Sequence, residues 1–156
     1  MSTISLTLNE IYKLAIKTLL NNGCDEINAK AVARTVSDAE RDGSISHGLF
    51  RIPGYVASLK SKKVKGYAKP KVQYLTQNVI CVDGDYGFAP TSINVGIPDL
   101  VNITKKLGVG ILTIKNTHHF AALWHETEAL AEKNLIGIAC TAYKPSVAPA
   151  GAKKAL

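Results

Sequence analysis

Apolar residues recur at helical spacing at the start of the chain. Between positions 8 and 19 they share one helix face, and Thr7 followed by Glu10 has the spacing of a capping box. Gly23 is a natural helix end. A second helix is expected over about residues 28–42, because small apolar residues there form one face suited to close packing against the first helix.

A third helical pattern covers residues 48–61. Pro53 has no backbone N–H and Gly54 weakens a helix, so this segment is predicted to begin late or to kink. Two short β-type runs follow at residues 72–75 and 78–82. They predict a hairpin or two sheet edges.

The middle of the chain predicts a turn followed by a helix. Residues 83–87, Asp-Gly-Asp-Tyr-Gly, are rich in turn formers, and residues 93–107 have a helical pattern that Gly108 ends. Pro98 is expected to be tolerated only near the first turn of this helix.

The last part of the chain has the clearest order of elements. A β-type run at residues 109–115 precedes a polar loop at 116–120, a helical pattern at 121–134 and a second β-type run at 135–141. This order predicts a parallel βαβ unit, in which functional groups favour the loops after strand ends.

The predicted fold class is therefore α/β, with N-terminal helices followed by a mixed sheet that includes the βαβ unit. Residues 1–62 are expected to form a helical segment and residues 63–156 the start of an α/β domain. A length of 156 residues with 46% hydrophobic content suits one domain with a core. No apolar run approaches the roughly 20 residues that cross a bilayer, and the N-terminus lacks the order of a secretory signal, so a soluble cytoplasmic protein without membrane partners is expected.

Charge and cysteines add two constraints. Of 19 basic residues in a chain of net charge +7, six are lysines between Lys60 and Lys71. We interpret that segment first as a solvated connector and second as a basic module that binds a polyanion; nucleic acid is disfavoured because Tyr67 is its single aromatic residue. Cys24, Cys81 and Cys140 form no CxxC pair, so buried apolar thiols are expected instead of disulfides or zinc ligands.

Two polar segments carry the candidate chemistry. His47, Arg51 and Tyr55 fall four residues apart, so they share a face if this region is helical. His118 and His119 follow a predicted strand. Without further context His47 is more often a polar residue at a helix start, and Tyr55 is more often a core aromatic.

Several common sites are excluded. GxGxxG, the P-loop pattern, HExxH and GxSxG do not occur in the sequence, so a Rossmann cofactor site has no support. The spacing of His118, His119, His125 and Glu126 matches no usual metal-ligand pattern, and no metal site is expected. His118 and His125 are interpreted as structural or surface residues.

Four ordered motifs carry a family resemblance. They are Ser46-His47-Gly48 with Arg51 and Tyr55, Asn116-Thr117-His118-His119-Phe120, Leu135-Ile136-Gly137-Ile138, and Pro145-Ser-Val-Ala-Pro149. In this order they resemble the type-2 malate/L-lactate dehydrogenase family, which includes ureidoglycolate, sulfolactate and diketogulonate oxidoreductases and imino-acid reductases. The resemblance implies a homodimeric oxidoreductase that uses NAD or NADP in a non-Rossmann fold.

The resemblance also implies roles for individual residues. His47 and His119 become the acid/base candidates, Ser46, Arg51 and Tyr55 surround a small anionic 2-hydroxy or 2-oxo acid, and Thr141 contacts the cofactor. A histidine that titrates near neutrality can serve both reaction directions, and an arginine can hold the substrate carboxylate through two hydrogen bonds. Which histidine transfers the proton stays open; the position after a strand end favours His119.

The sequence departs from the family in the segment after Phe120 and in length. Residues 121–126 are bulkier than the small, glycine-containing residues usual there, and family members are much longer. The chain is interpreted as the N-terminal part of such an enzyme, with most cofactor contacts outside it and weak or absent activity alone. The alternatives are a basic module that uses Lys60–Lys71 to bind nucleic acid or another polyanion, or a non-catalytic fragment or subunit.

Overall fold

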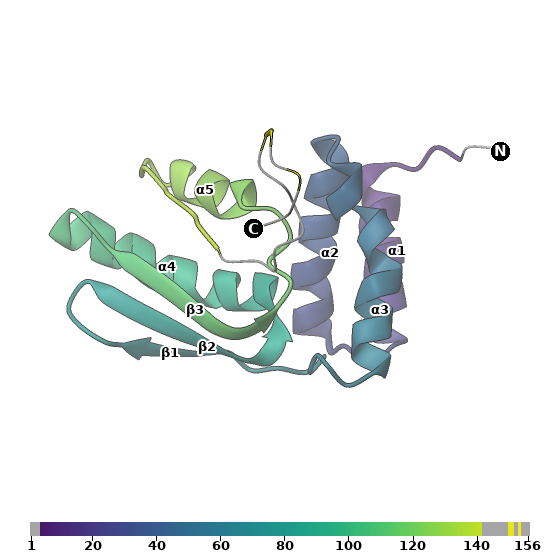
Figure 1. The fold of residues 1–156 in the computed structure, drawn as a ribbon, viewed down its shortest axis with the longest axis horizontal. Helices are drawn as coiled ribbons and strands as arrows, with labels where there is room; N and C mark the ends of the chain where they lie inside the picture. The colour runs from purple at the N-terminus through teal and green to yellow at the C-terminus, as the bar shows by residue number, and fades with distance from the viewer. Residues whose placement is uncertain (1–3, 142–149, 152, 154–156) are drawn as a thin grey trace.

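A computed structural model describes residues 4–141, 150–151 and 153 of the chain (Figure 1). Figure 1 shows three helices, α1, α2 and α3, grouped at one end of the molecule and a sheet with α4 and α5 at the other. The described helices, 3-10 turns and strands are α1 Leu8–Leu20, α2 Glu26–Arg41, η1 Ile45–His47, η2 Leu49–Arg51, α3 Ile52–Lys60, β1 Lys71–Tyr74, β2 Val79–Phe88, α4 Ala89–Leu107, β3 Ile111–His118 and α5 Trp124–Ala131.

The first two helices form as the sequence predicts. The Thr7–Glu10 capping box is confirmed: the Glu10 N–H donates to Thr7 Oγ1 (3.3 Å), and the Thr7 N–H donates to Glu10 Oε2 (2.8 Å). Asp25 caps α2 by accepting the Asn28 N–H at 2.9 Å. The small residues of α2 bury one face against α1, and the same core includes Tyr55 and Phe88.

The sheet has the strand order β1-β2-β3. β1 and β2 form the predicted antiparallel hairpin, whereas β2 and β3 are parallel. The structure thus contains a βαβ unit, but it is β2-α4-β3, with α4 as the crossover, and not the unit predicted at residues 109–141. A second core lies between the sheet and the helices that cover it, formed by Ile80, Leu100, Val101, Ile103 and Leu130.

The prediction of a strand at residues 135–141 was wrong. This segment has no strand partner among the described residues, and Ile136 and Ile138 are 97% and 92% exposed. An alternating apolar pattern becomes a strand only where a neighbouring edge and a core face receive it. The same error explains Cys140, which is exposed, whereas Cys24 and Cys81 are buried as predicted.

The predicted turn at residues 83–87 lies inside β2 as a bulge. Asp83 pairs with Lys115 and Gly87 pairs with Thr117, so β2 has extra residues between two nearby partners on β3. Asp85 (φ 51°) and Tyr86 (φ 57°) adopt the left-handed conformation that the turn-forming composition favours. The prediction of turn conformations at residues 83–87 was correct, but β2 continues after them to Phe88.

This bulge also fixes part of the lysine-rich connector. Lys65 Nζ lies 2.7 Å from Asp85 Oδ2, which also accepts the Lys69 N–H at 3.0 Å. The Lys65 ammonium, through this contact, is the main cause of the lowered pKa of Asp85. Lys65 therefore has a structural partner, although the polyanion hypothesis for the whole segment stays a prediction.

Helix α4 corrects the expectation for Pro98. The helix begins at Ala89, with Pro90 in its first turn, and Pro98 lies inside it. Because Pro98 has no N–H, the carbonyl of Asn94 lacks its usual intrahelical partner. Burial of α4 against the sheet offsets that cost. In the part of the chain that the structure describes, neither α4 nor any other helix is both long and apolar enough to span a bilayer.

Gly84 marks a close approach of β2, β3 and α4. A Cβ at this position would lie 2.2 Å from Thr117 Cγ2 and 2.7 Å from Ser92 Oγ. Gly84→Ala is therefore expected to lower the free energy of unfolding by about 1–3 kcal/mol, as overpacking does, measured from urea denaturation. Gly54→Ala is the control, since a Cβ there meets nothing within 4 Å in helix α3. Equal stability of the two variants would contradict the packing of β2 against α4.

Candidate functional site

Two 3-10 turns bring the chain from α2 to the segment that carries His47 and Arg51. Gly48 separates them, and the next N–H, that of Leu49, donates to Glu40 Oε1 at 2.7 Å. A Cβ on Gly48 would lie 2.0 Å from the same Glu40 oxygen. Glu40 on α2 thus holds the turn, and glycine is required for the carboxylate to approach it.

His47 lies at the end of the first turn and is partly buried. Its Nδ1 is 3.0 Å from Ser46 Oγ and 3.3 Å from Ser44 Oγ. The edge of its ring meets Trp124, with ring centroids 6.2 Å apart and planes at 85°. Burial, and then the charge of Arg51, lowers the pKa of His47.

Arg51 ends the second turn, immediately before α3. Its Nε donates to the Ser46 carbonyl at 2.7 Å, which ties the guanidinium to the His47 turn. Among the described residues no Asp or Glu forms an ion pair with Arg51 (the ion pairs of the described chain are at Lys30, Arg34, Arg41, Lys65, Lys115 and His125). The guanidinium is therefore available to an external carboxylate.

The expected shared helical face is only partly correct. His47 belongs to a 3-10 turn and Tyr55 to α3, so no single helix carries both. Their neighbourhood with Arg51 comes from the two tight turns. After burial, the Arg51 charge is the next cause of the lowered pKa values of His47 and His119, and it opposes the rise that burial causes in the pKa of Tyr55. The structure thus brings together four of the side chains that the sequence selected, and Ser46 contributes through its carbonyl and its hydroxyl.

Tyr55 connects α3 to the loop after β3. The Tyr55 hydroxyl lies 3.2 Å from His119 Nδ1, and the two rings meet edge to face at 5.3 Å. Tyr55 is 4% exposed, and burial raises the pKa of its hydroxyl to about 12. It is therefore a neutral donor at physiological pH, with its ring packed against Phe88.

His119 is held as a neutral imidazole in one tautomer. The Ala121 N–H donates to His119 Nδ1 at 3.2 Å, so the ring proton resides on Nε2. Both residues have left-handed backbones, φ 51° for His119 and φ 64° for Ala121, at a cost on the order of 1–3 kcal/mol each. Burial, followed by the charges of Arg51, His118 and His47, lowers the pKa of His119 to about 4.

His118, the last residue of β3, has a separate partner. Its Nε2 lies 3.2 Å from Ser58 Oγ on α3, and its ring is 6.0 Å from that of Phe88. Burial, and then the charge of Lys63, lowers its pKa. These contacts join β3 to α3 and agree with the interpretation of His118 as a structural residue.

A second set of contacts, which sequence reasoning missed, attaches α5 to the end of α2. Trp124 Nε1 donates to Asp42 Oδ2 (3.1 Å), and His125 Nε2 lies 3.1 Å from Asp38 Oδ2. Arg41 Nη2 is 3.4 Å from Glu128 Oε2. Trp124 is the single tryptophan in the sequence. The bulk of residues 121–126, compared with the small residues usual in the family, was the sequence signal that could have indicated these contacts.

Two expected contributions stay untested. Thr141 is exposed and lies at the end of the segment described up to residue 141, so its role at the cofactor remains a prediction. The motif at residues 145–149 lies outside the described residues.

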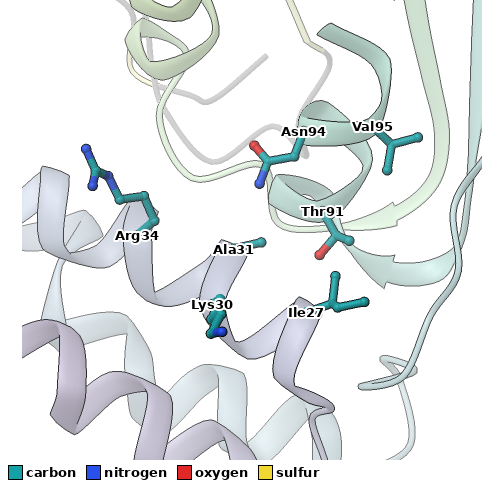
Figure 2. Close-up of a pocket in the computed structure, with 7 residues that line it drawn as sticks. All are labelled: Ile27, Lys30, Ala31, Arg34, Thr91, Asn94 and Val95. Carbon is teal, nitrogen blue, oxygen red and sulfur yellow. The ribbon is translucent and has the colours of Figure 1, made fainter. Parts of the chain in front are cut away.

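Figure 2 shows a groove between α2 and α4, of about 360 Å³. It is lined by Ile27, Lys30, Ala31 and Arg34 from α2 and by Thr91, Asn94 and Val95 from α4. It shares no lining residue with the histidine site. Its two cations already have carboxylate partners on their own helix, Glu26 for Lys30 and Asp38 for Arg34.

Comparison with curated proteins finds reductases. The chain is 39% identical over 148 residues to the Δ1-pyrroline-2-carboxylate reductase of Ancylobacter novellus, covering 95% of this chain and 43% of that protein. It is 36% identical over 151 residues to Δ1-pyrroline-2-carboxylate reductase 2 of Burkholderia multivorans, covering 97% of this chain and 44% of that protein.

Solved structures show the same fold. The Δ1-piperideine-2-carboxylate reductase of Pseudomonas syringae matches with a TM-score of 0.81 at 37% identity, over 84% of this chain and 40% of that one. The malate dehydrogenase of Entamoeba histolytica matches with a TM-score of 0.78 at 26% identity, over 85% of this chain and 37% of that one.

These matches cover nearly all of this chain but less than half of each relative: the chain spans 43% and 44% of the two curated reductases. A family model described as malate/L-lactate dehydrogenase matches residues 6–156. The matched range includes every residue of the histidine site. The chain belongs to the malate/L-lactate dehydrogenase family of oxidoreductases.

Proposed function

We propose that this chain supplies the substrate-binding and proton-transfer groups of an NAD(P)H-dependent reductase that acts on a small 2-carboxylated substrate. The carrying observation is the convergence of Arg51, which has no acidic partner among the described residues, with His47, Tyr55 and His119. The substrate class that we favour is a cyclic 2-imino carboxylate, since the similar proteins named above are pyrroline- and piperideine-2-carboxylate reductases. A 2-oxo acid of the malate/lactate type is the second candidate.

The proposed reaction needs an anchor and a proton source from the protein. Arg51 binds the substrate carboxylate, which orients the C=N or C=O carbon. The cofactor, when bound, supplies a hydride to that carbon. The nitrogen or oxygen then takes a proton from the protein, and in the reverse direction it returns the proton.

We assign the proton transfer to His47 and not to His119. A general acid must be protonated near the working pH, and the pKa of His119, about 4, keeps that ring neutral. Its Nδ1 is also occupied by the Ala121 N–H. His47 is less buried, and its Nδ1 contacts two hydroxyls, which accept or donate according to its protonation state. The sequence-based preference for His119 is thus reversed in this proposal.

We assign His119 a different task. With Nδ1 as acceptor, the neutral ring presents its Nε2–H as a fixed hydrogen-bond donor, and Tyr55 and the Ala121 N–H set its orientation. A preorganised donor of this kind stabilises negative charge that develops on the substrate. Tyr55 acts by positioning His119.

The charge of the site fits an anionic dinucleotide. After burial, the charges of Lys63 and Arg51 are the next causes of the lowered pKa values of His118 and His119, respectively. However, the sequence has no glycine-rich phosphate loop, and Thr141 is the one position that we propose toward the cofactor. We derive no further cofactor contact from this chain. NAD versus NADP, a homodimer and a cytoplasmic location stay predictions.

A chimera tests the function. Residues 1–156 are joined to the C-terminal part of the Pseudomonas syringae reductase, and NAD(P)H oxidation is followed by absorbance. We expect turnover of Δ1-pyrroline-2-carboxylate in preference to pyruvate or oxaloacetate, and weak or absent turnover by the 156-residue chain alone. A folded chimera that reduces none of these acids would overturn the proposal, and robust turnover by the chain alone would refute the expected need for further residues.

A further inference from the structure

We infer that Trp124 is a specificity-determining residue that favours a monocarboxylate with an apolar ring over a dicarboxylate. The inference rests on the proposed function and names the substrate class of that site. Trp124 begins α5, and its indole meets the edge of His47 with ring centroids 6.2 Å apart. It therefore borders the group to which we assign proton transfer.

The indole is held in place by α2. Its N–H donates to Asp42 Oδ2 at 3.1 Å, and Asp42 in turn accepts two bonds from Arg41, at 2.7 and 2.9 Å. The Arg41 contact, with the Trp124 bond, lowers the pKa of Asp42, so the carboxylate stays ionised. The neighbouring contact of His125 with Asp38 fixes the same turn of α5. Trp124 is thus held rigidly at the border of the site, because the first two residues of α5 are both attached to the end of α2.

A fixed indole at this position distinguishes between substrates by aromatic contact and by the desolvation of charged groups. A substrate carboxylate on Arg51 and a reacting carbon near His47 place the body of the substrate beside the indole. A flat apolar ring gains an aromatic contact there. A second carboxylate would lose water against an apolar surface without a partner.

Arg41, which binds the same Asp42 carboxylate as Trp124, cannot compensate for that loss. Arg41 already contacts Asp42, Asp38 and Glu128. A second substrate carboxylate would have to displace one of these three acids. The arrangement therefore selects against malate-like acids and for cyclic imino acids.

The test uses the 156-residue chain, which contains every residue named in the inference. Pyrrole-2-carboxylate serves as a planar ring probe and malate as a dicarboxylate probe, and calorimetry gives both affinities. We expect tighter binding of the ring acid, accompanied by a change in the fluorescence of the single tryptophan. Trp124→Leu should reduce the preference for the ring acid about two- to tenfold. Asp42→Ala should change it in the same direction, because the indole loses its anchor.

Controls separate this inference from the proposed function. Tyr74→Leu removes an exposed aromatic from β1 and should leave the preference unchanged. Arg51→Met should weaken the binding of both acids by the same factor. Loss of binding in Arg51→Met together with an unchanged preference in Trp124→Leu would overturn the role of Trp124 and leave the proposed site intact. Failure of the chain to bind either acid would overturn both.

Discussion

Replacing His47 by glutamine is expected to lower kcat of the chimeric reductase about 10²- to 10⁴-fold, the usual contribution of a general acid. Glutamine keeps polar contacts to the Ser44 and Ser46 hydroxyls but cannot give up a proton. KM should change little, since Arg51 still holds the carboxylate. Steady-state kinetics measures both constants.

His119→Gln is the matched comparison for this prediction. It removes a neutral donor and leaves the acid in place, so its loss of kcat should be smaller than that of His47→Gln. The opposite order would return the proton transfer to His119. Circular dichroism of the same samples shows whether each variant is folded. A variant that is not folded would be replaced by the corresponding asparagine substitution.

The pH dependence follows from the same assignment. Burial and Arg51 lower the pKa of His47, so in the free enzyme the acid form is present below a pKa that lies under the ordinary value for histidine. kcat/KM for reduction should therefore fall as the pH rises through that pKa, and kcat/KM for oxidation should rise. In His47→Gln this limb of the profile should disappear.

Replacing Arg51 by methionine is expected to lower kcat/KM of the chimera roughly 10- to 100-fold, mainly through KM. This range corresponds to a net loss of about 1.5–3 kcal/mol for the charged contact, since about 1.4 kcal/mol corresponds to a factor of ten. Methionine retains an unbranched apolar stem like that of arginine and removes the guanidinium. Its insertion also removes the Arg51 bond to the Ser46 carbonyl, so a further small loss in kcat is expected from the His47 turn.

Two variants sharpen the prediction for Arg51. Arg51→Lys keeps the charge but not the planar fork, so it should recover only part of the affinity. Arg34→Met removes an arginine that is paired with Asp38 and lines the α2–α4 groove, and it should leave KM near that of the parent chimera. Equal KM values for Arg51→Met and Arg34→Met would exclude Arg51 as the carboxylate anchor.

The sequence predicted best where the determinants are local. The Thr7–Glu10 capping box, the β1–β2 hairpin and the late start of α3 depend on residues within a few positions of each other, and all three are confirmed. The strand at 135–141 depended on a distant partner that periodicity does not reveal. Pro98 was misjudged for a similar reason, because the burial that compensates for it is tertiary.

The candidate site divides in the same way. Residue types and motif order selected His47, Arg51, Tyr55 and His119, and the structure brings them together. The spacing suggested a common helix. Instead, two 3-10 turns, held by Glu40 and separated by Gly48, bring these side chains together. The different acidities of the two imidazoles were not predictable, because they depend on burial and on a backbone N–H that a left-handed residue directs to His119.

The parallel pairing of β2 with β3 has a consequence for how the loop can evolve. Phe88 is registered with His118, the last residue of β3, so His119 is the first side chain beyond the ladder. Successive strand residues face opposite sides, and one residue inserted into or deleted from β3 would exchange the two imidazoles between Ser58 and Tyr55. Insertions and deletions among related proteins should therefore be absent from β3. They should accumulate after Trp124, where the number of residues does not decide which histidine contacts Tyr55.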